Sequence, residues 1–482
     1  MASVRYLGVD VGTTVTKAAL FDEAGDVVAI ADRPTQLSHP GENLVEQDVE
    51  EVLHSVANVV ADVRSDDAIP SLLAITGQGD GCWLVDGDGR PVRPAVSWMD
   101  GRAGDIYREW ERDGTVEALY AINGNVVFPG SQACLLRWFA DNEPAALDRA
   151  TTAGYCKDVI VQRLTGTRAT DPSDASLPFG VGDGYAHESI ELCGLGEHTD
   201  LLAPVSRPLP VAELSGAGAE LTGLPAGTPV TGGPFDLPAC AAGAGVLEPG
   251  DGLLTIGTTL ACQVLVDEVD VSGSPAGMHL AAQRPGRWLR ALPAMVGCAS
   301  LDWLLGMLDM SADEVSPAIE QSPAGAGGVE VLPYLAPSGE RAPFIDPAAR
   351  GQLTGVRLST TRQDAVRAMC EGIAFAARDC FAATPLTGRL LVCGGGARSR
   401  PWLQIFADVL QRTVHVARTP EVGARGAVLS ALAALDRPAD VPEWTRPEAT
   451  VEPDPAMADR YDEAFARYQQ HRQAAQQMWR TA

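Results

Sequence analysis

One hairpin-like segment occurs twice in the chain, and this repeat constrains the fold more than any other feature. Residues 9–22 read VDVGTTVTKAALFD, and residues 254–267 read LTIGTTLACQVLVD. The glycine, both threonines, the leucine and the final aspartate are identical, and most other apolar positions match in character. Chance similarity is an alternative, because alternation is common to all strands. Each copy begins one half of the chain, which favours a duplicated domain.

The length agrees with this interpretation, because 482 residues exceed what one ordinary hydrophobic core holds. We expect an N-terminal domain at 1–247 and a C-terminal domain at 248–438, followed by a linker and a terminal helix at 439–482. The Pro- and Glu-rich stretch 437–455 has the composition of a linker. Aromatic residues on one face of the last segment predict that its helix docks on the body of the protein.

Apolar periodicity predicts an α/β fold in both halves. In the first half, the pattern predicts strands at 4–10, 15–22, 27–31 and 72–76 and a helix at 49–63 that Asp48 caps. In the second half, it predicts helices at 362–381, 399–411 and 423–435 and strands at 389–393 and 413–417.

The composition excludes several partners. Acidic residues outnumber basic ones by 63 to 36, and a formal charge of −27 repels nucleic acid and anionic membranes. No apolar run approaches the ~20 residues that cross a bilayer. The N-terminus runs directly into a predicted strand without the features of a secretory signal, so we expect a cytoplasmic protein. Ten scattered cysteines without a C-x-x-C pair predict buried or incidental thiols.

Common nucleotide and metal motifs are absent. A Walker A loop needs glycine before its lysine, and neither Lys17 nor Lys157 follows a glycine. The GQGDG segment at 77–81 lacks the spacing of a dinucleotide fingerprint. No HExxH motif or His/Cys cluster has the spacing of metal ligands.

The repeated turns themselves offer a way to bind phosphate. Successive backbone N–H groups in a tight turn can hold an anion, threonine hydroxyls add donors, and glycine lets the phosphate approach. This predicts phosphate binding at Gly12, Thr13 and Thr14, and at Gly257, Thr258 and Thr259. Asp10 precedes the first turn and could hold Mg²⁺ directly or through water. An ordinary hairpin with an aspartate at its mouth is the alternative.

Several further segments together resemble the FGGY carbohydrate kinases, which belong to the actin-like ATPase superfamily. They are WMDGRA at 98–103, KDVIVQRLTGTRATDPSDAS at 157–176, PSGERAPFIDPAARGQLTGV at 337–356, CGGGARSRPWLQIFADVL at 393–410 and GARGA at 423–427. The resemblance spans about residues 5–435. It implies two actin-like (ribonuclease H-like) α/β domains with the active site in the cleft between them.

The resemblance also implies a catalytic base. GGPFDLPACAAGAG at 232–245 places Asp236 after a Gly-rich strand end and before a helix of small residues. Phosphoryl transfer to an alcohol requires a group that accepts the hydroxyl proton. A simple helix N-cap is the alternative role for Asp236.

For the sugar, the resemblance points to the segments after the strand at 72–76 and around 98–103. The implied sugar ligands are Gln78, Asp80, Trp98, Asp100 and Arg102. Xylulose kinases typically show G-Q-M-H-G where this chain has GQGDG at 77–81, and the present form resembles erythritol kinases and some L-xylulose kinases. Asp80 could equally be a turn residue between two glycines.

For the nucleotide, the resemblance implies ATP with Mg²⁺, bound mostly by the C-terminal half, while the sugar is bound mostly by the N-terminal half. Gly394, Gly395, Gly396 and Ala397 are expected against adenine and ribose, and Lys17 near the phosphates. Glu340 and Arg341 are expected to be structural or gating residues.

The expected activity is ATP-dependent phosphorylation of a hydroxyl of a small sugar. A pentulose such as D- or L-xylulose is our first choice, and erythritol or another tetritol is the alternative. A non-catalytic actin-like ATPase or a sugar sensor is the alternative from another class. We expect neither nucleic acid nor membrane as a partner. Oligomeric state stays open, although members of the family are often homodimers.

Overall fold

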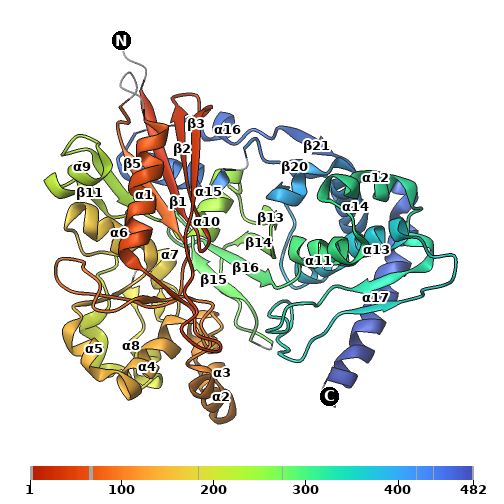
Figure 1. Cartoon of the computed structure of the whole chain (residues 1–482), viewed down its shortest axis with the longest axis horizontal. Helices are drawn as coiled ribbons and strands as arrows, with labels where there is room; N and C mark the ends of the chain where they lie inside the picture. The colour runs from red at the N-terminus through yellow and green to blue at the C-terminus, as the bar shows by residue number, and fades with distance from the viewer. Residues whose placement is uncertain are drawn as a thin grey trace. The chain divides into compact units, whose positions relative to one another are not determined.

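A computed structural model describes residues 4–64, 69–182, 184–273, 275–419, 421–437 and 439–479 (Figure 1). The chain forms two compact units, and each unit gathers separate segments. The first unit comprises Met1–Gly245, Asp267–Leu289 and Glu421–Thr445, and the second comprises Val246–Val266, Arg290–Pro420 and Arg446–Ala482. The units therefore interleave in sequence, whereas the ranges expected from the sequence are contiguous.

A mixed six-stranded sheet forms the centre of the first unit, in the order β11-β12-β5-β1-β2-β3. Its strands are β1 (Arg5–Val11), β2 (Val15–Asp22), β3 (Val27–Pro34), β5 (Leu73–Gly77), β11 (Val211–Glu213) and β12 (Pro229–Gly232). β1, β2 and β3 form the predicted antiparallel meander. β5 runs parallel to both β1 and β12, and every residue of β5 is buried, as a central parallel strand requires.

Helices cover both faces of this sheet. On one face, α1 (Val49–Val63) and α6 (Cys156–Thr165) enclose a core with Leu7, Val9 and Ile75. Asp48 caps α1, as predicted, by accepting hydrogen bonds from the backbone N–H groups of Glu50 and Glu51.

On the other face, α15 (Val422–Ala434) packs on Ala19 and Phe21. Glycines let α15 approach α10 (Asp236–Ala244) closely. A Cβ at Gly426 would lie 1.8 Å from the carbonyl oxygen of Ala239, and one at Gly243 would lie 1.9 Å from that of Val422. Any larger residue at either glycine would force these two helices apart.

The second sheet has seven strands in the order β15-β16-β14-β13-β19-β20-β21, and its last six repeat the order of the first sheet, which supports the duplication inferred from the hairpins. Its strands are β13 (Gly252–Ile256), β14 (Leu260–Val266), β15 (Met278–Ala281), β16 (Trp288–Ala294), β19 (Leu390–Cys393), β20 (Val414–Val416) and β21 (Ala449–Val451). β13 forms a hairpin with β14 and runs parallel to β19, as β1 does with β2 and β5. The predicted helices of this half appear as α13 (Arg362–Ala382), α14 (Arg400–Leu410) and α15.

The stretch 437–455, which is expected to be a linker, contains packed elements in the residues that the structure describes, and the chain passes from the first unit to the second between Thr445 and Arg446. β21 pairs with β20 within the second unit. α16 (Val441–Trp444) belongs to the first unit, where Trp444 is fully buried against Tyr6 and Phe21. The composition of this stretch reflects its prolines, whereas its structure depends on the buried indole of Trp444 and on the pairing of β21 with β20. α17 (Ala458–Trp479) docks on the second unit as predicted, through Tyr461 and Tyr468.

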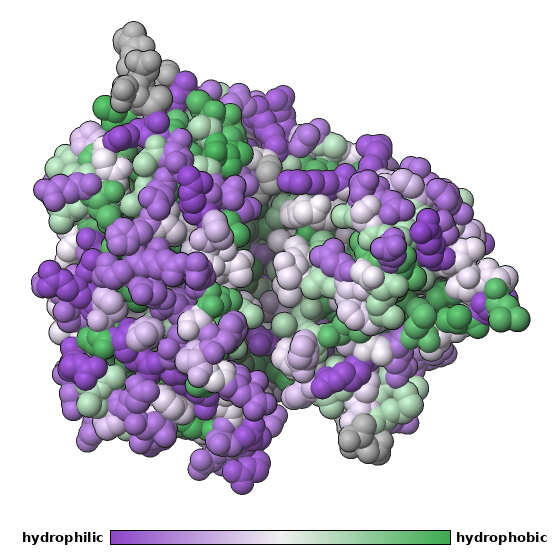
Figure 2. Space-filling model, viewed as in Figure 1, coloured by the Kyte–Doolittle hydropathy of each residue, from purple (hydrophilic) through white to green (hydrophobic). Residues whose placement is uncertain are grey.

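Part of the surface of the first unit is hydrophilic. On the face shown in Figure 2, hydrophilic residues predominate over the part of the first unit that carries α4 (Gln132–Asn142) and α5 (Pro144–Arg149). Among the helices that the structure describes, none has the length and apolar character of a membrane span.

Candidate active site

Three parallel strands of the first unit bring the predicted residues to one edge of its sheet. Val11 pairs with Gly77, and Ile75 pairs with Gly232, so the carboxyl ends of β1, β5 and β12 lie side by side. The first phosphate turn, Gln78 and the segment leading to Asp236 follow these ends directly. In α/β sheets, this edge is where ligands bind.

Asp236 is the first residue of α10 and is not its cap. Phe235 occupies the cap position, and no side chain caps the helix. Burial of the carboxyl group raises the pKa of Asp236 well above its ordinary value, and the charge of Asp10 raises it further, while a hydrogen bond with the backbone of Leu237 lowers it. A carboxylate with a raised pKa is a stronger proton acceptor than an ordinary aspartate. The environment is therefore suited to a general base.

Asp10 lies in β1 and is electrostatically coupled to Asp236. Burial raises the pKa of Asp10 to about 6, Lys17 lowers it, and Glu421 raises it. Lys17 forms an ion pair with Glu421 at 3.6 Å. A Cβ at Gly423 would lie 2.4 Å from Oδ2 of Asp10, so this glycine leaves the room that the carboxylate occupies.

Glu421 lies outside every motif, although this residue stands only two positions before the GARGA segment at 423–427. Its pairing with Lys17 brings together residues that are far apart in sequence. No sequence motif around Glu421 indicates its contact with Lys17.

The chemistry of these carboxylates fits a divalent cation. Asp10 and Asp236 repel each other, and both have raised pKa values, so the site is short of positive charge. No group of three or more His, Cys, Asp or Glu side chains in the described residues forms a complete protein cage for a metal. Mg²⁺ in kinases is typically held by one or two carboxylates together with water and substrate phosphates, which is compatible with this arrangement.

The hydroxyl of Thr13 is engaged by predicted sugar-binding residues. It donates a hydrogen bond to Oε1 of Gln78 at 3.0 Å and accepts one from Nε1 of Trp98 at 2.9 Å. Gln78 in turn donates to Oε1 of Gln47 at 2.8 Å. The turn itself closes through a bond from the amide of Gly12 to the carbonyl of Val15 at 3.1 Å. The Thr13 hydroxyl thus orders Gln78 and Trp98, while the neighbouring Thr14 is exposed.

Asp80 is a buried turn residue in this structure. Its φ of 52° lies in the left-handed region, and Gly81 follows with a φ of 71°. One carboxylate oxygen accepts a hydrogen bond from the amide of Gln132 at 3.3 Å. The turn role is therefore present, and a role in sugar binding stays a prediction.

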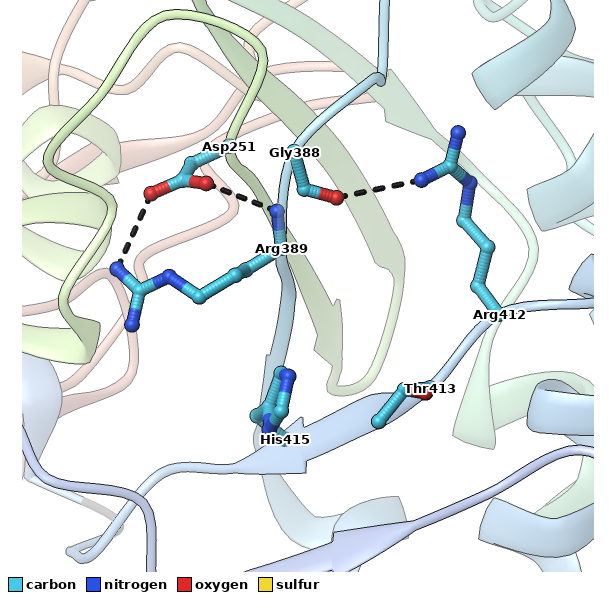
Figure 3. Close-up of a pocket in the computed structure, with 6 residues that line it drawn as sticks. All are labelled: Asp251, Gly388, Arg389, Arg412, Thr413 and His415. Carbon is cyan, nitrogen blue, oxygen red and sulfur yellow. Dashed lines mark hydrogen bonds and ion pairs between the residues drawn. The ribbon is translucent and has the colours of Figure 1, made fainter.

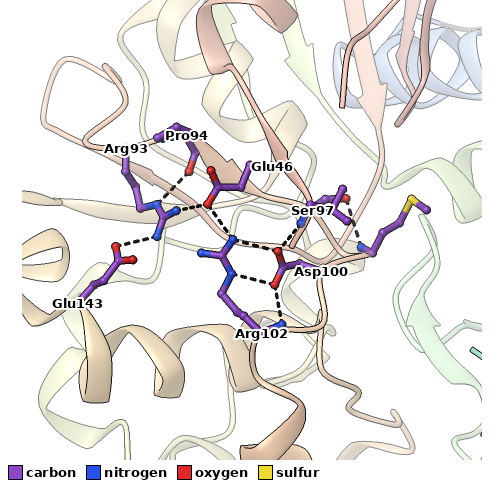
Figure 4. Close-up of polar contacts among 9 residues, drawn as sticks. Glu46, Arg93, Pro94, Ser97, Asp100, Arg102 and Glu143 are labelled. Atoms are coloured by element: carbon purple, nitrogen blue, oxygen red, sulfur yellow. Dashed lines mark hydrogen bonds and ion pairs between the residues drawn. The ribbon is translucent and has the colours of Figure 1, made fainter. Parts of the chain in front are cut away.

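Asp100 and Arg102 belong to a buried ionic network (Figure 4). Nε of Arg102 donates to Asp100 at 2.8 Å, and Nη2 donates to Glu46 at 2.7 Å. The side chain of Arg102 is only 4% exposed, and that of Asp100 is 0% exposed. Burial opposes the charge of Arg102, but its hydrogen bonds to Asp100 and Glu46 raise its pKa. Oδ2 of Asp100 also accepts a bond from the amide of Val45 at 2.6 Å.

Arg93 extends this network by pairing with both Glu46 and Glu143. The network holds the segment around residue 45 against the segment 97–102 (Figure 4). Glu46, Arg93 and Glu143 belong to no motif, so they were not predicted from the sequence. Asp100 and Arg102 are engaged with protein partners, so this structure favours a role in holding the segment 97–102 in place.

The predicted nucleotide residues meet at the matching edge of the second unit. β13 and β19 are parallel, with Thr255 beside Cys393, so both turns follow the same sheet edge. A Cβ at Gly394, whose φ is 97°, would lie 2.5 Å from the carbonyl oxygen of Ile256. Only glycine permits this contact between the two turns.

The second hairpin turn also leads into a helix. The carbonyls of Gly257 and Thr258 accept hydrogen bonds from the amides of Cys298 and Ala299, at 2.9 and 3.1 Å. These amides open α11 (Cys298–Leu308). Several of the turn's own polar groups are therefore used to join β13 to α11.

A separate pocket of about 350 Å³ lies elsewhere in the second unit (Figure 3). Its lining comes from residues that precede or begin β13, β19 and β20, namely Asp251, Gly388, Arg389, Arg412, Thr413 and His415. It is at the amino ends of these strands, away from the glycine turn. Asp251 pairs with Arg389 at 3.1 Å, and Arg412 donates to the carbonyl of Gly388 at 3.2 Å. The two arginines of this pocket therefore bind protein groups at the edge of the sheet.

Glu340 holds a loop of the second unit. Its carboxylate accepts hydrogen bonds from the amides of Met295, Arg341 and Ala342, at 2.7, 2.8 and 3.2 Å. Burial raises its pKa to about 7, which these three bonds counteract. Of the two expected roles, this geometry favours the structural one.

Models of the FGGY family of carbohydrate kinases match most of the chain. The N-terminal domain of the family matches residues 5–243, and the C-terminal domain matches residues 276–435. The chain belongs to this family. The assignment confirms the resemblance noted in the motifs and makes the protein an FGGY carbohydrate kinase.

Relatives named erythritol kinase and xylulose kinase are similar to this FGGY kinase. The erythritol kinase of Brucella abortus is 31% identical, over 98% of this chain and 96% of its own. The xylulose kinase of Klebsiella pneumoniae is 30% identical, over 96% of this chain and 98% of its own. The crystal structure of xylulose kinase from Rhodospirillum rubrum matches with a TM-score of 0.88 and 30% identity, covering 99% of this chain and 100% of that one. These relatives confirm the two-domain α/β fold.

Proposed function

We propose that this FGGY kinase transfers the γ-phosphoryl group of ATP to a hydroxyl of a small sugar or polyol, with Asp236 as the general base. The observation that carries the proposal is the environment of Asp236, at the start of α10 beside Asp10. When the hydroxyl oxygen attacks the γ-phosphorus, its proton passes to the Asp236 carboxylate. The bond from that phosphorus to the β,γ-bridging oxygen breaks, and ADP leaves.

Asp10 is the residue that would hold Mg²⁺, and the metal would neutralise charge on the ATP phosphates. Gly423 leaves room for the Asp10 carboxylate. Lys17 is 42% exposed although paired with Glu421, so it is accessible to a phosphate oxygen. These positions support a phosphate site in the first unit, at the mouth of the β1–β2 hairpin.

In the second unit, the turn formed by residues 394–397 would receive the adenosine. The Gly394 backbone lies directly against Ile256, at the end of β13, and Gly395 has no atom within 4 Å of the position of a Cβ. An open glycine backbone beside a strand end lets a flat ring lie close to the main chain. The neighbouring turn 257–259 would contribute donors to the phosphates.

The acceptor is proposed to be a four-carbon polyol or a five-carbon ketose. Gln78 and Trp98 are ordered by Thr13 at the sheet edge, and an amide with an indole suits a ligand that alternates hydroxyls and C–H surface. Among the relatives, erythritol kinase and xylulose kinase are similar to this chain to nearly the same degree.

Sugar-dependent release of ADP tests the proposal. The purified chain with ATP and Mg²⁺ should release ADP only when a suitable acceptor is added, and the sugar phosphate should appear in equal amount. ADP release that no acceptor changes would contradict the proposal and favour a non-catalytic ATPase. Binding of a sugar without any ADP release would favour a sensor.

A further inference from the structure

Three charged residues meet where α15 begins over the β1–β2 hairpin. Two of them, Asp10 and Lys17, are direct partners in the register of these antiparallel strands. Side chains of directly opposed residues point to the same face of a sheet, with Cβ atoms about 5 Å apart. The ammonium group of Lys17 is therefore within reach of the Asp10 carboxylate, and the hairpin by itself would favour an ion pair between them.

The start of α15 lies on the same face of the sheet. A Cβ at Gly8 would lie 2.3 Å from the carbonyl oxygen of Ala424, so the first turn of the helix touches β1. Gly8 precedes Asp10 by two positions, and residues two positions apart in a strand share a face. A Cβ at Gly423 would lie 2.4 Å from Oδ2 of Asp10. The helix thus brings its first residues against this carboxylate.

Glu421 is the third charged residue. It occupies the cap position of α15, but its side chain does not cap the helix. Instead, its Oε1 lies 3.6 Å from Nζ of Lys17. The Glu421 side chain is only 10% exposed, so the packing around it fixes the position of its charge. Among the ion pairs of the residues that the structure describes, Lys17 is joined to Glu421 and not to Asp10.

Two carboxylates therefore compete for one ammonium group, and the folded chain places it on Glu421. If Lys17 were paired with Asp10, that ion pair would have to break before a divalent cation could bind to Asp10. The ammonium group would also repel the arriving cation. A carboxylate supplied by α15 removes this competition while the two strands keep their pairing.

We propose that Glu421 is a positioning residue that holds Lys17 away from Asp10, so that the Asp10 carboxylate stays available to a divalent cation. This proposal rests on the proposed function, because it concerns the metal and phosphate site of that reaction. Glu421 itself takes no part in the transfer of the phosphoryl group. Its ion pair also keeps the Lys17 ammonium group at the mouth of the hairpin, where the phosphates would lie.

A crystal structure of Glu421→Gln without metal is the first test. Glutamine keeps the size of the side chain but removes the charge that attracts Lys17. We expect the ammonium group to turn to Asp10 and form an ion pair with it, whereas the wild-type protein keeps the pair with Glu421. A variant in which Lys17 makes no ion pair with Asp10 would overturn the proposal.

Binding of Mn²⁺ in the presence of ADP, followed by electron paramagnetic resonance, measures the consequence for the metal. Mn²⁺ is suited to the same oxygen ligands as Mg²⁺. In Glu421→Gln, the dissociation constant for Mn²⁺ should rise by about 5-fold, the size of effect that an ion pair with a half-exposed lysine produces. An unchanged dissociation constant in this variant would contradict the proposal.

The loss of a nearby negative charge also weakens cation binding directly, and Lys17→Met separates the two causes. In the Lys17→Met background no ammonium group competes for Asp10, so adding Glu421→Gln should change the dissociation constant by no more than about 2-fold. Glu330→Gln, in β17 (Glu330–Leu332) of the second unit, is the matched control. It removes a carboxylate that pairs with Arg467, and Mn²⁺ binding should stay unchanged.

The two proposals fail in different ways. If Glu421→Gln weakens Mn²⁺ binding equally in both backgrounds, the effect is one of charge alone and Glu421 does not act through Lys17. That result would leave the kinase function standing, provided that an acceptor stimulates ADP release by the wild-type protein. If no acceptor stimulates ADP release, the proposed function is itself wrong.

Discussion

The hydroxyl of Ser173 links the backbone of the proposed catalytic segment to a buried charge cluster. It accepts a hydrogen bond from the amide of Phe235 at 2.8 Å and donates one to Oδ2 of Asp171 at 2.6 Å. Oδ1 of Asp171 lies 2.9 Å from Nζ of Lys157. Lys157 is fully buried and also pairs with Asp158 and Asp174. The position of Asp236 therefore depends on residues that do not themselves act on the substrate.

Replacing Ser173 should weaken catalysis more than binding. In Ser173→Ala, the amide of Phe235 loses its partner, and the start of α10 is less well fixed. We expect kcat to fall by about 10-fold with KM nearly unchanged, since small displacements of a catalytic group cost this much or more. Ser173→Thr should restore most of the activity. Ser176→Ala removes a nearby hydroxyl that does not bond to Phe235 and serves as the control. An equal loss of kcat in both alanine variants would mean that the effect is only structural.

Lys157 should contribute strongly to the stability of the folded protein. Its ammonium group is the partner of three buried carboxylates, and Lys157→Met would leave them without it. Breaking a buried ion pair typically costs about 3–5 kcal/mol, so we expect a loss of at least that size in urea unfolding. Lys17→Met is the control, because the Lys17 side chain is 42% exposed and such pairs contribute at most about 1 kcal/mol. Equal losses in the two variants would contradict the role assigned to the cluster.

The carboxylate of Asp10 should lower the free energy of unfolding at neutral pH when no metal is bound. Its pKa is raised from 3.8 to about 6, so the folded state binds the proton more tightly than the unfolded state does. Stability then falls as the pH rises through this window, and the full penalty is present above pH 6. Asp10→Asn should therefore be more stable than wild type by up to about 3 kcal/mol at pH 7.5 and by less than about 1 kcal/mol at pH 4.

Denaturant unfolding at the two pH values measures this difference, and adding Mg²⁺ with ATP should reduce it by stabilising only the wild-type protein. The variant should also have lost most of its activity. A stability difference that is independent of pH would show that the Asp10 carboxylate is not in a desolvated site.

Gly423 should be required for the arrangement of Asp10. The methyl group of Gly423→Ala would meet Oδ2 of Asp10, whose distance from the Cβ position is 2.4 Å. We expect kcat to fall by about 10-fold and the Mg²⁺ concentration for half-maximal rate to rise. Gly306→Ala in α11 is the control, because nothing lies within 4 Å of its Cβ position. That variant should keep full activity and gain up to about 1 kcal/mol of helix stability. Normal Mg²⁺ dependence in Gly423→Ala would contradict the proposed metal site.

The sequence predicted the elements well because they follow local periodicity. The β1–β2 hairpin, α1 and its Asp48 cap, and the helices and strands after residue 361 depend on patterns within a few residues. Contacts between distant residues were harder to predict. Glu46 and Arg102 are 56 positions apart, and only the fold shows that they pair. The packing of Trp444 depends on residues near the opposite end of the chain, and the composition of the stretch 437–455 does not indicate this packing.

Asp236 is proposed to accept the hydroxyl proton during phosphoryl transfer. The most direct measurement compares single-turnover formation of sugar phosphate by the wild-type protein and Asp236→Asn, with acceptor binding followed by calorimetry. Asparagine keeps the size of the side chain but cannot take the proton. We predict a rate at least ~10³-fold lower in the variant, with acceptor affinity retained. Near-normal turnover in Asp236→Asn would rule out Asp236 as the proton acceptor.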